Sequence, residues 1–154
     1  PGAFYKSRPK SLERKLVIMI KPICRNLQIL AQKARPATKQ DIPLAKDLLE
    51  TLAANSADCV GMAANMIGAP VAVIAVSLGP VSVAMLNPKL TSKKEPYQTK
   101  EGCLSLDGQR PATRYQQIVV EYFDLNWQKQ SLSLTGFAAE AVQHELDHCN
   151  GIII

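Results

Sequence analysis

The sequence predicts an α+β fold in which antiparallel or mixed sheet packs around a C-terminal helix. Three observations lead to this prediction: a helical stretch lies in the first half of the chain, strand-like apolar segments occupy the middle, and a second helical stretch ends it. A run of strands followed by a terminal helix is typical of α+β proteins, because strands and helices alternate in parallel α/β folds. At 154 residues the chain has the length of one domain with a buried core.

The composition is that of a globular protein, with 47% hydrophobic and 20% charged residues. No apolar run approaches the ~20 residues that a membrane span needs. Five basic and one acidic side chain in residues 1–18 account for +4 of the net charge of +5, so the remainder offers no basic face for nucleic acid. Because the chain starts with Pro1 and Met19 is a plausible natural start, we interpret residues 1–18 as an added leader or a disordered arm. Residues 19–154 are then expected to form a single domain.

The first predicted helix spans residues 38–54. Asp41 lies near its N-cap and Pro43 in its first turn, which are positions that these residue types favour. Apolar side chains then recur at helical spacing, at Leu44, Ala45, Leu48, Leu49, Leu52 and Ala53. We expect this helix to pack on the core and to carry no chemistry.

A glycine-broken stretch at residues 59–70 separates this helix from four segments with the composition of strands. These segments are residues 71–77, 81–86, 117–124 and, more weakly, 130–134. The dipeptide Gly79-Pro80 predicts a turn between the first two, and Asn87-Pro88 is expected to end the second.

The last predicted helix begins at Thr135 or Gly136 and contains both histidines of the chain, His144 and His148. At i and i+4 the two imidazoles share one helix face about one turn apart, where they can bind a single metal ion. Glu145 lies between them, where a carboxylate can reach a water on that metal. The pattern therefore indicates metal-dependent hydrolysis.

A catalytic metal typically takes three protein ligands and keeps one position for water. The best third candidate is Cys103, although a lone buried structural cysteine is the default interpretation. Asp147 could orient a ligand or be a solvated helix charge, and both interpretations stay open. The sequence has no CxxC pair and no secretory signal, so its four cysteines are expected to be reduced thiols in a cytoplasmic protein.

Three motifs resemble those of the peptide deformylases, and they occur in the family's order. Residues 59–66 read CVGMAANM against the family's Gly-x-Gly-apolar-Ala-Ala-x-Gln. Residues 101–105 read EGCLS against Glu-Gly-Cys-apolar-Ser, and residues 143–148 read QHELDH against Gln-His-Glu-x-Asp-His. The last two motifs are highly specific in combination, and the resemblance extends from about residue 20 to the end of the chain.

The resemblance implies a deformylase-like fold and an enzyme that removes the N-formyl group from formyl-methionyl peptides or nascent chain ends. Cys103, His144 and His148 would bind one divalent metal ion, and Glu145 would be the general base. The family is known for Fe²⁺. Because one thiolate and two imidazoles also suit Zn²⁺, Ni²⁺ or Co²⁺, the ligands alone do not choose the metal.

The resemblance also implies a set of substrate contacts. Gly61 and Gly102 would let an extended peptide approach the backbone closely on either side. The backbone N–H of Leu104 would donate to the oxygen that becomes negative during hydrolysis. Arg110 matches a family arginine near the substrate, although an exposed arginine is the default, and Met66 occupies the position of the family's glutamine.

The chain departs from the family pattern at Cys59, in place of the first glycine, and at Met66. A thioether cannot donate a hydrogen bond, and losing one donor to the developing oxyanion costs about 10²–10³ in rate. Asn65 has an amide and could substitute if it faced the site.

Two functions therefore stay open: a deformylase of reduced activity, and a catalytically impaired paralogue that binds metal and peptide. A hydrolase for another acyl group has lower weight. Neither a specific nucleic acid nor a membrane is an expected partner, and the oligomeric state is not predicted.

Overall fold

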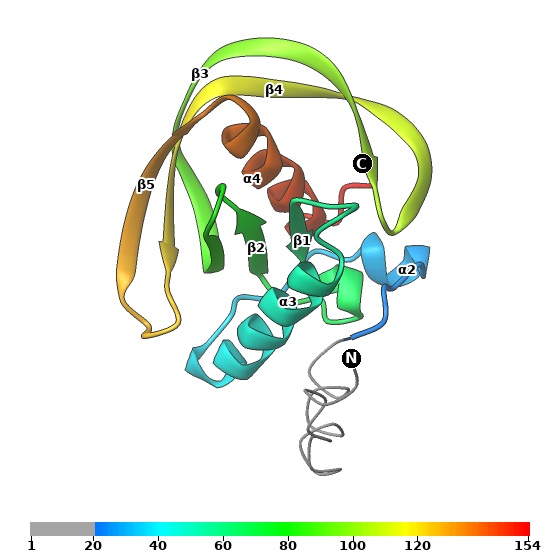
Figure 1. The fold of residues 1–154 in the computed structure, drawn as a ribbon, viewed down its shortest axis with the longest axis vertical. Coiled ribbons are helices and arrows are strands. Elements are labelled where there is room, and N and C mark those ends of the chain that lie inside the picture. The colour runs from blue at the N-terminus through cyan, green and yellow to red at the C-terminus, as the bar shows by residue number, and fades with distance from the viewer. Residues whose placement is uncertain (1–20) are drawn as a thin grey trace, which may run out of the picture.

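The computed structural model describes residues 21–154, so the predicted arm at residues 1–18 and the proposed start at Met19 lie outside the described residues. Within them, five strands form one antiparallel sheet in chain order: β1 (Gly61–Ala63), β2 (Val73–Ser77), β3 (Ser82–Cys103), β4 (Leu106–Phe123) and β5 (Lys129–Thr135). The helices are α2 (Leu27–Leu30), α3 (Ile42–Ala54) and α4 (Gly136–Cys149) (Figure 1). The predicted α+β class is confirmed, and the sheet is antiparallel rather than mixed.

The two longer helices build a separate core on each face of β2. Val73 and Ala75 belong to the cluster that includes α3, whereas Ile74 and Val76 belong to the cluster that includes α4. Because both faces of β2 are buried, its sequence is apolar at every one of these positions instead of alternating with polar residues. The helix α4 also packs against β1, near the start of the glycine-broken stretch.

The helix predicted at residues 38–54 is confirmed, with a short 3₁₀ turn (Lys39–Asp41) preceding α3. The hydroxyl of Thr38 accepts a hydrogen bond from the N–H of Gln40, and the carboxylate of Asp41 accepts one from the N–H of Thr38 at 2.8 Å. Arg35 adds an ion pair with Asp41 at 2.9 Å. Reciprocal capping of this kind stabilises the start of the 3₁₀ turn, which leads directly into α3.

The prediction that the second strand ends at Asn87-Pro88 is wrong, because β3 continues to Cys103. The register of the β3–β4 ladder shifts after Leu86, and Asn87 has a φ of 52°. The side-chain amide of Asn87 pairs with the backbone N–H and carbonyl of Ala37 at 2.7 and 2.9 Å. Asn-Pro here marks an irregularity that bends the strand rather than one that terminates it.

The extension of β3 and the first half of β4 were not predicted from the sequence. Residues 91–100 are mostly exposed and polar, so they lack the apolar alternation that identifies a half-buried strand. Together the two strands form a long hairpin that curves over α4 (Figure 1). Its tip, where Cys103 pairs with Leu106, is thereby brought to the C-terminal half of that helix.

The other predicted elements are confirmed with small shifts of their bounds. The segments at 71–77, 117–124 and 130–134 correspond to β2, the end of β4 and β5, and α4 begins at Gly136 after Thr135 as its N-cap. The stretch at 59–70 contains β1 and a 3₁₀ turn, Ala64–Ile67. No helix in residues 21–154 is long and apolar enough to cross a membrane.

Candidate active site

The tip of the β3–β4 hairpin brings Cys103 to the two histidines of α4. The Sγ atom of Cys103 lies 3.3 Å from Nε2 of His148, and this nitrogen lies 3.2 Å from Nε2 of His144. In a tetrahedral shell with metal–nitrogen distances of about 2.0–2.1 Å, two nitrogen ligands lie about 3.4 Å apart. The spacing and the chemistry of these three donors therefore fit one shared transition-metal ion, as the sequence predicted.

The protonation of the two imidazoles is tightly coupled. Burial acts to lower the pKa of both, but hydrogen bonds to Cys103 and Glu101 overcome it at His144 and raise the pKa of that ring to about 10. At His148 burial and the neighbouring charge of His144 act together and lower the pKa to about 3. The cluster thus holds a proton that a divalent cation would displace on binding.

A buried ion-pair network supports His144 from behind. Nδ1 of His144 lies 2.8 Å from Oε1 of Glu101. Arg114 donates from Nε and Nη2 to the same carboxylate at 2.6–3.1 Å, and its Nη1 donates to Asp147 at 2.8 Å. Asp147 is therefore not a free charge on the helix surface. It forms an ion pair with Arg114, which binds the Glu101 carboxylate that contacts His144. Such contacts behind a metal ligand fix its ring orientation.

Neither Arg114 nor the contact between Glu101 and His144 was predicted from the sequence. The sequence does contain one indication that Arg114 is buried. The two-residue period of buried positions on β4 includes Ala112, Arg114, Ile118 and Val120. A charged residue in that register requires a buried partner of opposite charge. The partner comes from β3, and its identity depends on the hairpin register that pairs residues near the tip.

Glu145 is buried beside the cluster, with 4% of its surface exposed. A Cβ atom on Gly61 would lie 2.8 Å from its Oε2, so the absence of a side chain on β1 makes room for this carboxylate. Burial, the largest influence, raises the pKa of Glu145 to about 7. Its Oε1 has no hydrogen-bond partner within residues 21–154. A carboxylate with these properties can accept a proton from water near neutral pH.

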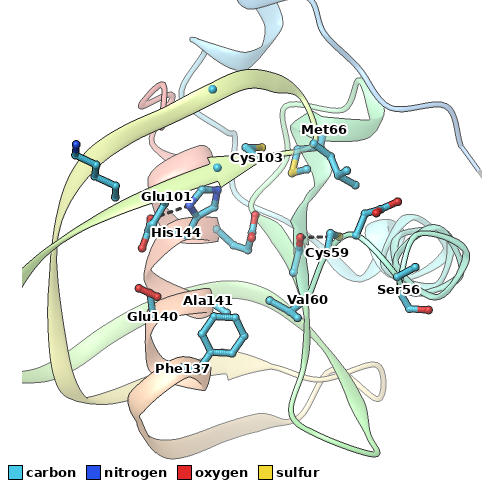
Figure 2. Close-up of a pocket in the computed structure, with 18 residues that line it drawn as sticks. Ser56, Cys59, Val60, Met66, Glu101, Cys103, Phe137, Glu140, Ala141 and His144 are labelled. Carbon is cyan, nitrogen blue, oxygen red and sulfur yellow. Dashed lines mark hydrogen bonds and ion pairs between the residues drawn. The ribbon is translucent and has the colours of Figure 1, made fainter.

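A cavity of about 600 Å³ opens in front of Cys103, His144 and Glu145 (Figure 2). Four residues predicted to contact substrate line it, namely Gly61, Met66, Gly102 and Leu104. The structure therefore brings seven of the nine residues singled out for the site to one cavity wall. His148 lies behind this wall, fully buried.

Arg110 does not line the cavity. Its Nη1 donates to the carbonyl of Asp107 at 2.9 Å, and its other two nitrogens have no hydrogen-bond partner in the described part of the chain. The contact of Arg110 with substrate therefore stays a prediction.

The two departures from the motif at residues 59–66 have local structural explanations. The Sδ atom of Met66 accepts a hydrogen bond from the N–H of Ala63 at 3.4 Å, so the thioether is held against the backbone. The thiol of Cys59 donates to the carbonyl of Gly61 at 3.3 Å. Burial, reinforced by the charge of Glu145, raises the pKa of Cys59 to about 11, so this thiol stays protonated at neutral pH.

Asn65 does not replace the missing donor. Its amide nitrogen donates to the carbonyl oxygens of His148 at 3.0 Å and Leu30 at 3.4 Å, on the side away from the cavity. The interpretation that its amide could serve the site is therefore wrong. The Asn65 side chain instead connects the segment that follows β1 to the end of α4 through its hydrogen bond to His148.

The comparisons with known proteins point to one family. The model of the polypeptide deformylase family matches residues 20–154. Peptide deformylase from Clostridium beijerinckii is 46% identical over 136 residues, which are 88% of this chain and all of that protein. The crystal structure of peptide deformylase from Thermotoga maritima has a TM-score of 0.78 at 30% identity, covering 87% of this chain and 94% of that one. A Met-Ala-Ser-bound class I type b peptide deformylase from Acinetobacter baumannii has a TM-score of 0.76 at 28% identity, covering 87% and 95%. The chain belongs to the peptide deformylase family.

Proposed function

We propose that this protein hydrolyses the N-formyl amide of formyl-methionyl peptides and nascent chain ends, with Cys103, His144 and His148 holding one divalent cation. The observation that carries the proposal is the meeting of a thiol and two imidazoles beside a buried carboxylate, at the wall of an open cavity. Membership of the family supplies the reaction, and the peptide in the related Acinetobacter baumannii structure supports a peptide as ligand.

The donor set suits Fe²⁺, the metal implied by the family, and also Zn²⁺, Ni²⁺ or Co²⁺. A cation held here would act as a Lewis acid that polarises the formyl carbonyl and makes water more acidic. Glu101 and Arg114 keep the ring of His144 aimed at the cation site, and burial keeps bulk water away from His148.

In the proposed mechanism Glu145 is the general base. Its carboxylate takes a proton from the attacking water and passes it to the leaving amine, so that formate and a free amino terminus are released. The N–H of Leu104 donates to the carbonyl oxygen as negative charge develops on it. Gly61 and Gly102 present bare backbone to the extended peptide.

Of the two functions left open by the sequence, the active enzyme is the better supported. No comparison favours an impaired paralogue, and Glu145 would have no role in a module that only binds. The missing donor at Met66 leads us to expect a reduced rate rather than none. A reducing compartment such as the cytoplasm suits the four cysteines, all of which are free thiols.

Two measurements test the proposal: the metal content of the protein, and the effect of a single substitution on deformylation. Protein purified without air or chelator should contain close to one divalent ion per chain by elemental analysis. Glu145→Ala should keep this metal and lose deformylation of a formyl-Met peptide, whereas Glu50→Ala, an exposed glutamate on α3, should change neither. Protein without metal would overturn the ligand assignment. Persistence of the rate in Glu145→Ala would remove that residue as the base.

A further inference from the structure

We propose that Asn65 is a positioning residue for the metal ligand His148, with its amide oxygen accepting the hydrogen on Nδ1 of the ring directly or through one buried water molecule. The inference rests on the proposed function, because it takes His148 as a ligand of the cation. Asn65 lies in the 3₁₀ turn that follows β1 and is 2% exposed. Its amide does not reach the cavity, but it contacts the end of α4 at His148.

His148 lacks the support that His144 has. Nε2 of His148 lies 3.3 Å from the Sγ atom of Cys103, so this nitrogen is the one that would bind the cation. The ring hydrogen then belongs on Nδ1, because a neutral imidazole carries only one. Nδ1 of His144 meets Glu101 at 2.8 Å, whereas Nδ1 of His148 is buried and has no hydrogen-bond partner within residues 21–154. A buried N–H group of this kind requires an acceptor.

Asn65 offers an acceptor next to this ring. Its Nδ2 donates to the carbonyl oxygens of His148 at 3.0 Å and Leu30 at 3.4 Å. Because carbonyl oxygens only accept hydrogen bonds, this end of the side chain must be the NH₂ group. The other end, Oδ1, is buried and also without a partner in the described part of the chain. The unpaired acceptor is therefore held beside the residue that carries the unpaired donor.

Two other buried acceptors have no partner among residues 21–154, and neither matches His148 as well. Oε1 of Glu145 belongs to the proposed base at the cavity wall, whereas His148 lies behind that wall. Oγ of Ser105 follows the tip of the β3–β4 hairpin, and no hydrogen bond within the described residues ties its side chain to α4. Asn65 is the candidate that is already bonded to His148 itself.

A hydrogen bond at Nδ1 would act on the cation through the ring. Buried water molecules typically bond to polar groups that lack other partners, so one such molecule could join Nδ1 of His148 to Oδ1 of Asn65. An acceptor at Nδ1 fixes the tautomer and the orientation of an imidazole ligand and makes its other nitrogen a better donor to the metal. Glu101 would do this for His144 and Asn65 for His148.

Nuclear magnetic resonance of the unaltered protein gives the first test. The chain contains two histidines, so its imidazole signals come from His144 and His148 alone. Nitrogen-15-labelled protein loaded with Zn²⁺, which is diamagnetic, should show two slowly exchanging ring N–H signals, both assigned to Nδ1. The His148 signal should show a nuclear Overhauser contact with the side-chain NH₂ group of Asn65. A hydrogen on Nε2 of His148, rapid exchange of its Nδ1 hydrogen with solvent, or no contact with Asn65 would overturn the proposal.

Two substitutions separate the acceptor from the fastening role of Asn65. Asn65→Leu and Asn65→Asp both lose the NH₂ group that holds the carbonyl oxygens, but only aspartate keeps an oxygen beside the ring. Asn65→Leu should lose the protected His148 signal, keep that of His144, and weaken Zn²⁺ binding about 10–100-fold in competition with a chelator. Asn65→Asp should keep the signal and most of the affinity. Equal losses in both variants would show that Asn65 only fastens α4.

Ser105→Ala is the matched control, because it removes the other buried hydroxyl acceptor without touching Asn65. It should leave the His148 signal and the Zn²⁺ affinity unchanged. Loss of the signal in Ser105→Ala and not in Asn65→Leu would assign the acceptor to Ser105 and overturn the proposal.

Metal content and activity separate this inference from the proposed function. Protein that takes up no Zn²⁺ would overturn the ligand assignment and the inference with it. Protein that binds Zn²⁺ and shows the expected signals, but hydrolyses no formyl-Met peptide when loaded with any of the proposed metals, would overturn the reaction and leave the inference standing. Hydrolysis together with an unchanged spectrum and affinity in Asn65→Leu would overturn only the inference.

Discussion

The thioether of Met66 occupies a point on the cavity wall where a hydrogen-bond donor would assist hydrolysis. We predict that Met66→Gln raises kcat/KM for formyl-Met peptides at least about tenfold, because one donor to a developing oxyanion is worth about 10²–10³ in rate. The amide oxygen of glutamine could accept the N–H of Ala63 that now meets Sδ, which would leave the NH₂ group for the substrate. The measurement is a steady-state deformylation assay on metal-loaded protein.

Met66→Leu is the matched control, since leucine has similar volume and no donor. It should leave kcat/KM close to that of the unaltered protein. An equal or lower rate in Met66→Gln would contradict the assumption that the substrate oxygen lies near this side chain.

Spacing and motifs predicted Cys103, His144, His148 and Glu145, and the structure brings these residues together. Residues four apart on a helix must share a face, whatever the rest of the fold, so the sequence carries that part of the site. Arg114 was missed because its partner is set by strand pairing between distant segments.

At the scale of single elements, the 3₁₀ turn that leads into α3 is capped by a carboxylate, that of Asp41. The hydrogen bond from Arg35, the largest influence, lowers the pKa of Asp41, and the N–H of Thr38 contributes to the same effect. A depressed pKa in the folded state means that the stabilisation is present above the ordinary pKa of the carboxyl group. It is lost as the pH falls through the lowered value.

We therefore predict that Asp41→Asn lowers the free energy of unfolding by up to about 1 kcal/mol at pH 7, because the neutral amide loses the ion pair with Arg35. The difference from the unaltered protein should shrink as the pH falls below the ordinary pKa of the carboxyl group and through the lowered pKa of Asp41, where this carboxylate becomes protonated. Urea denaturation at several pH values measures both quantities, and Glu50→Gln on the same helix should change neither. A difference that does not depend on pH would show that the charge of Asp41 is not the cause.

The elements that the sequence predicted well are those with at least one face in a core. α3 and α4 have apolar stripes, and β2 is apolar throughout because it lies between two helices. The arch of β3 and β4 has mainly exposed side chains, so hydrophobic periodicity could not reveal it. Asn87 and Pro88 have the residue types of a chain break, but pairing with Ala37 absorbs the irregularity within the strand.

For the molecule as a whole, the proposed cation links the tip of the β3–β4 hairpin to α4. We predict that removing it with a chelator lowers Tm by about 5–10 °C. A ligand at a hundred times its Kd contributes about 2.7 kcal/mol, and each kcal/mol shifts Tm by about 2–4 °C for a chain of this size. Differential scanning calorimetry with and without chelator gives the shift.

Cys103→Ala is the matched control for the effect of chelator on Tm. Because it lacks one of the three donors, its Tm should respond little to chelator or to added metal. A chelator effect of equal size in Cys103→Ala would show that the stabilising cation binds elsewhere.

The strands follow one another across the sheet in the order in which they occur in the chain, so each can join its predecessor by a short local closure. Within residues 21–154, α4 follows the last strand, β5, and packs back against β1, the first strand of the sheet. Its fourteen residues carry both imidazoles and the proposed base. A polypeptide released before those residues are made would lack both the core on one face of β2 and the hydrolytic centre. In this architecture, chemical competence depends on the helix that is made after all the strands of the sheet.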